Sequence, residues 1–300
     1  DYLIIFLLMF STPIMLGMER ANIELIIFLF LIVISFFRNL LFVNFFIMII
    51  AGLKYYPAIL LIINFINKIN LKSLLIFLLS IILILLLFYL DRGQILNIIN
   101  LKEIINPNGV ENVGMLIFSF YTLPELARSI TKELNSFNSE MSYYIFLFLN
   151  IFVFIYSFTK SVIKKKDSNR LVNFKIDKFE DRLYFLSSIM IMTIYFLEMN
   201  YVYKEIYFLG LIPFLKYKNQ IYKYKIIYNL ILIKFIILTL MWICQTLLFS
   251  SSIYVKGFNI LVKGLIDNFL VILIMLSILE FFKQFVKINL KKISFKKPHR

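Results

Sequence analysis

The chain has 300 residues, of which 61% are hydrophobic, and its mean hydropathy is +0.88. Soluble domains are about 45–50% apolar, so this composition excludes a soluble globular protein and predicts an integral membrane protein. The formal net charge of +15 lies mainly in short loops between apolar runs, where it suits the lipid bilayer and its anionic headgroups and not a nucleic acid partner.

Apolar runs that can cross or enter a bilayer recur along the whole chain. The runs 56–67 and 205–215 are too short for a straight crossing. We therefore expect broken or re-entrant helices there, buried in protein or lining a cavity. The expected fold class is all-α, a polytopic transmembrane bundle of about 8–10 segments. The candidate segments are 2–16, 22–37, 39–53, 56–67, 73–90, 143–159, 183–199, 205–215, 226–250 and 264–282.

We expect residues 1–300 to form a single membrane domain that lacks its N-terminal part. The chain begins with Asp1, is apolar from the second residue, and has neither the basic region nor the cleavage site of a signal peptide. We therefore expect more of the membrane domain upstream of Asp1.

The distribution of lysine and arginine predicts how the chain is oriented. If the basic loop 160–182 is cytoplasmic, alternating spans bring most of the other basic residues, including the tail 283–300, to the same side. We therefore expect a multi-pass protein of the cell membrane, with the loop 91–142 as its one long extracytoplasmic segment. Within that loop, the apolar spacing of 123–134 predicts an amphipathic helix on the membrane surface.

The string MERANIEL places four polar side chains between two apolar runs, on the expected outer side. They are Glu19, Arg20, Asn22 and Glu24. One interpretation is a helix start, since acids favour the first helical turn and asparagine can cap it. Arg20 serves neither need, and charges at the edge of hydrocarbon are usually kept for a task. A functional cluster is the alternative.

Two further polar motifs end apolar runs on the same expected side. Lys54 and Tyr55 precede a proline, and Asn200, Tyr201 and Lys204 form a tight turn before a short helix. Both motifs are compatible with an interfacial aromatic belt and a snorkelling lysine. Alternatively, the lysines can hold a phosphate, and the short helix can point its end into a ligand site.

Other chemistries have little support in the sequence. Cys244 and His299 are the single cysteine and the single histidine. Internal disulfides, thiol metal sites and histidine-bound zinc in the membrane body are therefore excluded. Lys234 interrupts an apolar span, where it either snorkels or faces a polar interior. We expect no cofactor and no metal site, although a carboxylate-bound divalent cation is not excluded.

The three motifs, taken in order, resemble those of the GT-C superfamily of polytopic glycosyltransferases, specifically the family-87-like branch. A proline followed by ERAN and an acid is similar to the E-R-G-N-x-D stretch of that family. AGLKYYPAILL is similar to the A-x-x-K-x-Y-P segment, and NYVYKEIYFLGLIPFL to the G-N-x-Y-D-Y-R-x-I-F-L-x-x-x-P stretch. The likeness covers about residues 10–215.

The sequence departs from the family pattern at four positions. Ala21 stands where the family tends to have glycine, Glu24 where it has aspartate, and Val202 where aspartate is common. Lys204 replaces a common arginine, which keeps the charge but loses a bidentate grip on phosphate.

The resemblance implies a membrane glycosyltransferase that moves a hexosyl or pentosyl group from a polyprenyl-phosphate donor to a glycan, lipid or protein acceptor outside the cytoplasm, in cell-envelope assembly. The main catalytic base of such enzymes would lie upstream of Asp1, with Glu19 and Glu24 as fallback bases or as partners that orient Arg20. The residues expected to stabilise the leaving phosphate are Arg20, Lys54 and Lys204. The residues expected to hydrogen-bond the sugar or phosphate are Asn22, Tyr55, Asn200 and Tyr201.

Two rival functions remain at this point. The chain can be a non-catalytic or transporting membrane protein, such as a polysaccharide flippase or a polymerase partner, or it can be a scaffold whose charges only anchor helices. The transferase hypothesis requires Arg20, Lys54 and Lys204 to be neighbours at one end of the bundle. A transporter would instead distribute these charges along a path through the bilayer.

Overall fold

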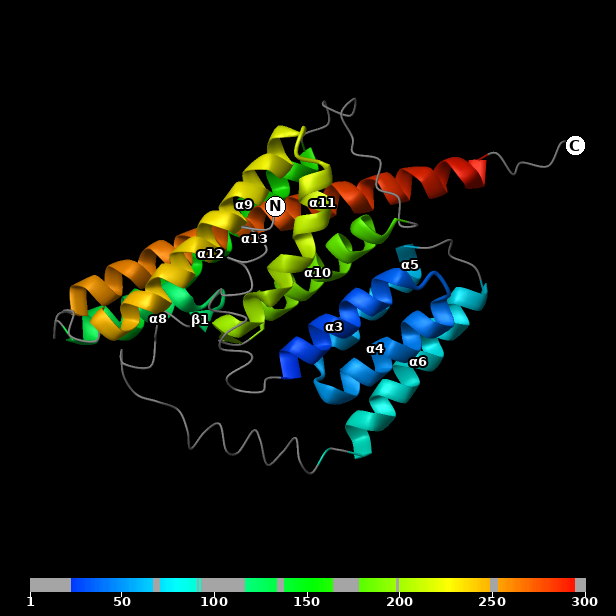
Figure 1. The fold of residues 1–300 in the computed structure, drawn as a ribbon, viewed down its shortest axis with the longest axis horizontal. Helices are drawn as coiled ribbons and strands as arrows, with labels where there is room; N and C mark the ends of the chain where they lie inside the picture. The colour runs from blue at the N-terminus through cyan, green and yellow to red at the C-terminus, as the bar shows by residue number, and fades with distance from the viewer. Residues whose placement is uncertain are drawn as a thin grey trace, which may run out of the picture.

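The structure, a computed structural model, describes residues 23–66, 71–90, 92, 117–133, 138–163, 178–197, 200–248 and 253–294. These residues are almost entirely helical, which confirms the all-α fold class (Figure 1). The elements are α3 (Ile23–Phe36), α4 (Leu40–Leu53), η1 (Tyr56–Ile62), α5 (Ile63–Ile66), α6 (Leu71–Leu90), β1 (Ile117–Phe118), α8 (Thr122–Glu133), α9 (Ser139–Ile163), α10 (Phe179–Phe196), β2 (Asn200–Tyr201), η3 (Val202–Leu211), α11 (Ile212–Tyr217), α12 (Tyr222–Leu248) and α13 (Ile253–Ser294).

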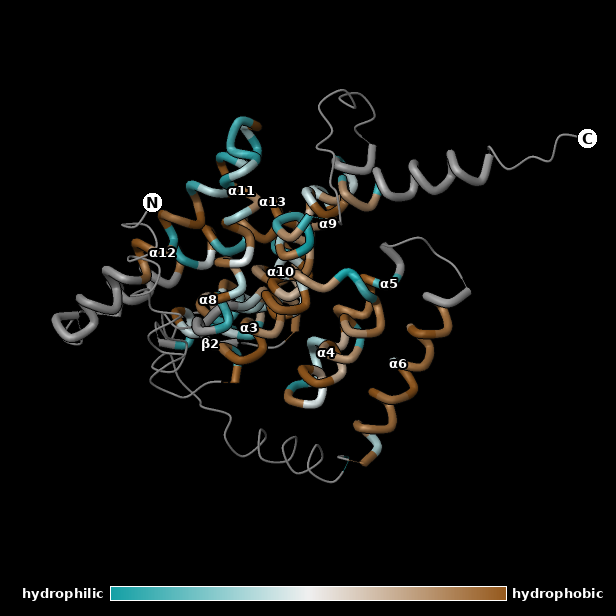
Figure 2. The backbone as a smooth tube through the Cα atoms, turned by 45° about the vertical axis from the view of Figure 1, so that its right-hand side comes forward, coloured by the Kyte–Doolittle hydropathy of each residue, from teal (hydrophilic) through white to brown (hydrophobic). Residues whose placement is uncertain are grey.

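Two helices of the described part of the chain are long and apolar enough to cross a membrane. They contain the segments Ser139–Lys160, in α9, and Leu261–Lys283, in α13. Three shorter apolar helices accompany them, namely Ile23–Phe36, Leu40–Leu53 and Leu74–Leu90. Figure 2 shows the hydrophobic character of α4 and α6 along most of their length.

Both segments predicted to be broken are broken. In each, a short stretch of 3-10 helix leads into a short α-helix, η1 into α5 and η3 into α11. A proline lies near each start, at Pro57 in η1 and at Pro213 in α11. Proline fixes its own φ and lacks an N–H, so it fits the first turn of a helix and interrupts a continuous one.

The helix α10 separates two groups of helices, with α3, α4 and α6 on one side and α9, α12 and α13 on the other (Figure 1). Every residue from Asp181 to Ile191 of α10 is buried. A helix that is buried all round belongs to the centre of a bundle. Aromatic and hydroxyl contacts join α10 to α13, through Phe185 with Phe281 and through Tyr184 with Ser277.

A pair of buried asparagines holds the broken segment η1–α5 against α4. The amides of Asn44 and Asn64 donate to each other's oxygens at 2.8 Å, and Asn64 also donates to the carbonyl of Leu61. Away from water, such amides find partners only within the protein. The α4 helix itself starts at Asn39, whose side chain accepts the N–H of Leu41 at 3.0 Å.

The amphipathic helix predicted at 123–134 is present as α8. It buries Leu123 and Leu126 against its neighbours α9 and α13. Just before α8 in the chain, β1 pairs antiparallel with β2. Asn150 of α9 donates to the carbonyl of Phe120 at 3.1 Å and accepts from Asn268 of α13, so the turn before α8 is fixed to two helices.

Residues that pair across the bundle define its two ends. At the Glu24 end, the start of α3 meets the end of α4 through the ion pair between Lys54 and Glu24. At the Glu280 end, the ring of Phe36 stacks on that of Phe179 with centroids 4.2 Å apart, and Lys223 pairs with Glu280 at 3.0 Å. The helices therefore alternate in direction between the two ends.

Candidate functional site

The short helix η3 carries polar residues into two different clusters. A 3-10 helix has three residues per turn, so side chains at i and i+3 lie above one another. Lys204 and Tyr207 therefore share one face of η3, and Glu205 and Phe208 share the next. The first face meets α3 and η1, and the second meets α12 and α13.

The Glu24 cluster consists of Glu24, Lys54, Tyr56, Lys204 and Tyr207. The carboxylate of Glu24 is completely buried and lies 2.6 Å from the ammonium of Lys54. It also accepts hydrogen bonds from the hydroxyls of Tyr56 and, at 2.8 Å, of Tyr207. Burying a carboxylate is costly unless donors such as these surround it.

The local sequence explains how Lys54 and Tyr56 reach Glu24. Lys54 ends α4 in an extended conformation, and its N–H closes the last turn on the carbonyl of Ile50 at 3.0 Å. Pro57 lies in the first turn of η1, which begins at Tyr56, and the hydroxyl of Tyr56 reaches Glu24 of α3. The expected helix-start role of Glu24 in α3 is also present, since it lies in the first turn.

The two lysines of the Glu24 cluster differ from its carboxylate in exposure. The side chain of Lys54 is 29% exposed, and Lys204 is half-buried with its ammonium 5.3 Å from the centre of the Tyr56 ring. Tyr56 therefore contacts Lys204 through its ring and Glu24 through its hydroxyl. The cluster therefore combines two partly exposed lysines with the buried carboxylate of Glu24.

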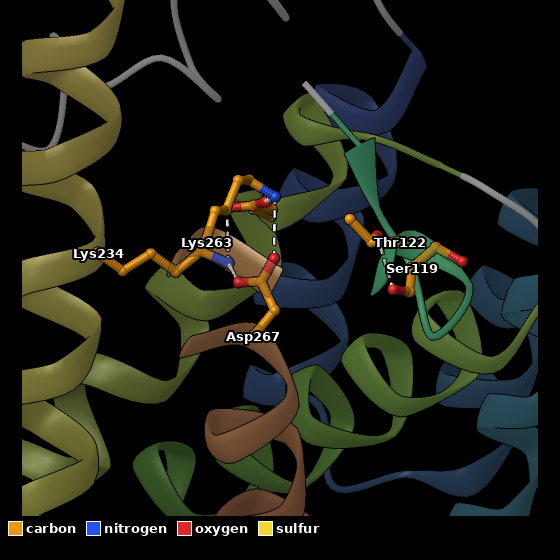
Figure 3. A network of polar contacts seen from close by, with 6 residues as sticks. Ser119, Thr122, Lys234, Lys263 and Asp267 are labelled. Atoms are coloured by element: carbon orange, nitrogen blue, oxygen red, sulfur yellow. Dashed lines mark hydrogen bonds and ion pairs between the residues drawn. The ribbon is translucent and has the colours of Figure 1, made fainter. Parts of the chain in front are cut away.

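The second cluster, the charge tetrad, consists of Glu205, Lys234, Lys263 and Asp267. Lys263 lies 3.0 Å from Glu205 and 2.9 Å from Asp267. Lys234 lies 2.9 Å from Glu205 and also pairs with Asp267. Figure 3 shows Lys234, Lys263 and Asp267 converging, with Ser119 of the turn before α8 and Thr122 at the start of α8 nearby.

The tetrad is closed to solvent and balanced in charge. None of its four side chains is more than 3% exposed, and each cation touches both anions. The ammonium of Lys234 also lies 4.7 Å from the centre of the Phe208 ring. Buried ions need this degree of mutual compensation, because an uncompensated one costs several kcal/mol.

Of the residues predicted for the site, Glu24, Lys54 and Lys204 come together in the Glu24 cluster. Tyr55 instead packs edge-on against Phe88 of α6 at 4.6 Å, and Asn200 and Tyr201 form β2. The remaining predicted residues, Glu19, Arg20 and Asn22, lie outside the described residues.

Sequence reasoning missed Tyr207 and most of the tetrad. The predicted apolar segment begins only at residue 264, whereas α13 begins at Ile253 and buries both Lys263 and Asp267. Their spacing of four residues in one helix was the available signal. Of the two alternatives for Lys234, a polar interior is the one found.

Within the described ranges, no group of three or more histidine, cysteine, aspartate or glutamate side chains could hold a metal ion. Comparison with protein-family models, with characterised proteins and with solved structures found no match for this chain.

Proposed function

We propose that the protein is an integral membrane glycosyltransferase that moves a sugar from a polyprenyl-phosphate donor to an acceptor at the membrane. The Glu24 cluster would hold the donor phosphate, with Lys54 and Lys204 as its cationic contacts. The observation that carries this proposal is that these two lysines, 150 positions apart in the sequence, join one cluster: Lys54 pairs with Glu24, and Lys204 lies over the ring of Tyr56, whose hydroxyl donates to Glu24.

The exposed surface of the helices supports a location in the bilayer. Large hydrophobic side chains are exposed along α6 and α9, where water would meet them in a soluble protein. Patches of this extent mark membrane or protein contacts. The exposed residues include Leu75, Leu79, Ile82, Leu85 and Leu90 of α6, and Phe148, Phe152, Ile155 and Tyr156 of α9.

The same arrangement supports an extracytoplasmic location for the cluster. The Glu280 end carries the basic residues around the connection of α11 and α12, including Lys216, Lys218, Lys223 and Lys225. Basic loops stay in the cytoplasm in most membrane proteins. The Glu24 end, at the opposite end of the helices, would then face the outside.

Sugar transfer requires the site to stabilise the departing phosphate and to accept the proton of the acceptor hydroxyl. As the acceptor oxygen bonds to the anomeric carbon, the bond between that carbon and the phosphate oxygen breaks, and the polyprenyl phosphate leaves with the electron pair. Lys54 and Lys204 would stabilise the charge on the departing phosphate. The hydroxyl proton goes to a carboxylate acting as general base.

The geometry favours an orienting role for Glu24 over that of a base. Its carboxylate already receives Lys54, Tyr56 and Tyr207, so its lone pairs are engaged in holding the cluster together. A different carboxylate would then take the acceptor proton.

Binding of polyprenyl monophosphate to the protein in lipid nanodiscs tests the phosphate site directly. We expect Lys54→Ala and Lys204→Ala each to weaken binding about tenfold, which corresponds to about 1.4 kcal/mol. Lys223→Ala removes a lysine of similar burial that pairs with Glu280 at the other end of the bundle, and should leave the affinity unchanged.

An equal loss of affinity in all three variants would mean that the lysines act only through the overall charge of the protein. An unchanged affinity in all three would refute the phosphate site. Sugar transfer itself is measured with the complete protein in proteoliposomes supplied with a panel of polyprenyl-phosphate sugars. Translocation of the donor without transfer would favour the transporting alternative.

A further inference from the structure

We infer that the charge tetrad is the anchor that fixes η3, so that Lys204 and Tyr207 are held toward Glu24. Glu205 and the other tetrad residues are then positioning residues for the Glu24 cluster. The consequence for ligand binding rests on the proposed function, whereas the anchoring itself does not.

The first step is the geometry of η3. The position of Glu205 fixes the rotation of η3 about its own axis, because each residue of a 3-10 helix is turned by about 120° relative to the one before. With Glu205 held between Lys234 and Lys263, the preceding residue Lys204 faces η1 and Tyr207 faces α3. A rotation that released Glu205 would withdraw both from Glu24.

The second step is the weakness of η3 on its own. A 3-10 helix has poorer hydrogen-bond geometry than an α-helix and rarely runs beyond three or four residues, yet η3 runs for 10. Its conformation must therefore be imposed by its surroundings. The two ion pairs of Glu205, together with Phe208 under the ammonium of Lys234, are polar contacts that hold η3 from the side of α12 and α13.

The third step is the close packing of η3 at Gly210, on the face that also carries Lys204 and Tyr207. A Cβ added at Gly210 would lie 2.0 Å from the Oγ of Ser187 and 3.4 Å from the ring of Phe28. The backbone of η3 thus lies directly on α10 beside α3. The tetrad binds η3 to α12 and α13, so η3 is held between those helices and the surface formed by α10 and α3.

The tetrad permits two matched variants that each remove one cation and one anion. Glu205→Gln with Lys263→Met takes away the ionic link of η3 and leaves the pair of Lys234 with Asp267. Lys234→Met with Asp267→Asn keeps η3 linked to α13 through Lys263 and Glu205. Both variants keep the tetrad neutral, and only the first releases η3.

The readout is the rate at which a charged methanethiosulfonate reagent modifies Lys204→Cys in a Cys244→Ser background. We expect the rate to rise at least tenfold when Glu205→Gln and Lys263→Met are added. The other pair of substitutions should change it less than threefold. Modification of Lys223→Cys, which lies at the Glu280 end of the bundle, should not change in either case.

An equal rise in both matched variants, or no rise in either, would overturn the anchoring role. If Glu205→Gln with Lys263→Met does not fold, Glu205→Asp keeps the charge but shortens the side chain by one methylene. Its modification rate at position 204 should lie between those of the wild type and a released η3, and an unchanged rate would again overturn the inference.

A second measurement separates this inference from the proposed function. In nanodiscs, Glu205→Gln with Lys263→Met should weaken polyprenyl monophosphate binding about tenfold, and should add nothing in a Lys204→Ala background. An added loss in that background would contradict positioning through Lys204. Absence of binding to the wild type would refute the phosphate site, while the modification rates would still decide the anchoring.

Discussion

The Glu24 cluster and the charge tetrad both combine lysines with buried carboxylates but differ in how their charges are satisfied. In the tetrad, each lysine touches both carboxylates, and no side chain is more than 3% exposed. In the Glu24 cluster, one buried carboxylate is surrounded by donors, and Lys54 is partly exposed. A closed set of ions stabilises the fold, whereas a partly exposed cation such as Lys54 suits the anionic ligand proposed above.

The largest expected effect comes from opening the tetrad at a single residue. Lys234→Met leaves Glu205 and Asp267 with one cation between them, and breaking such a buried pair costs about 3–5 kcal/mol. The unfolding midpoint in detergent should fall strongly. Adding Asp267→Asn should recover most of the loss, and equal destabilisation of the single and double variants would contradict a closed, balanced cluster.

A smaller effect is expected where η3 lies on α10. In Gly210→Ala the new methyl group would meet Ser187 at 2.0 Å, and overpacking of this kind costs about 1–3 kcal/mol. Gly52→Ala is the matched control, because nothing lies within 4 Å of a Cβ at that position of α4. Thermal unfolding should separate the two variants, and similar midpoints would contradict the close approach.

In the Glu24 cluster, Tyr207→Phe should cost about 1.5 kcal/mol, the lower range for a hydrogen bond to a charged group. The carboxylate of Glu24 keeps Lys54 and Tyr56 as donors, so the loss stays moderate. Tyr55→Phe serves as the control, since Tyr55 is 38% exposed and packs against Phe88. A larger loss for Tyr55→Phe would mean that the cluster has been assigned to the wrong tyrosine.

The smallest effect concerns α8, outside both clusters. Burial raises the pKa of Glu125 above the ordinary glutamate value, Arg128 opposes this shift, and Glu140 adds to it. The folded protein therefore holds the Glu125 proton more tightly than the unfolded chain does. The ionised carboxylate destabilises the fold above its raised pKa, and this cost disappears as the pH falls toward about 4.3.

Replacement of Glu125 by glutamine tests the direction of this pKa shift. The stability of Glu125→Gln relative to the wild type should increase with pH between about 4.3 and 7, as measured by unfolding midpoints at several pH values. Arg128→Ala should enlarge the difference, because Arg128 is the cation that favours ionised Glu125. A difference that grows toward low pH would contradict the raised pKa.

The sequence predicted most of the helical segments of the described chain. Apolar length identified the runs, and the short runs at 56–67 and 205–215 were correctly expected to be broken, because a bilayer-spanning helix needs more residues than they contain. The helix α13 was underestimated. The charged residues near its start are typical of a loop. Lys263 and Asp267 neutralise each other within the helix, so the helix includes them.

The candidate site was predicted in part. Glu24, Lys54 and Lys204 stand out because they are charges at the ends of apolar runs, and the structure brings them to one cluster. Tyr207 looks like one more aromatic residue in a short apolar run. Its role follows from the rotation of η3 and from the approach of α3, neither of which local sequence patterns contain.

The sequence distance between the partners of Glu24 has a consequence for membrane insertion. Lys54 follows Glu24 by 30 residues, whereas Tyr207 follows it by 183. A ribosome adds about 5–20 residues per second, so Lys54 is available within seconds and Tyr207 roughly 8–30 seconds later. If the protein enters the membrane as proposed, the α3–α4 hairpin would insert with Lys54 already beside Glu24, and the Tyr207 hydroxyl would join them only after the later helices had entered.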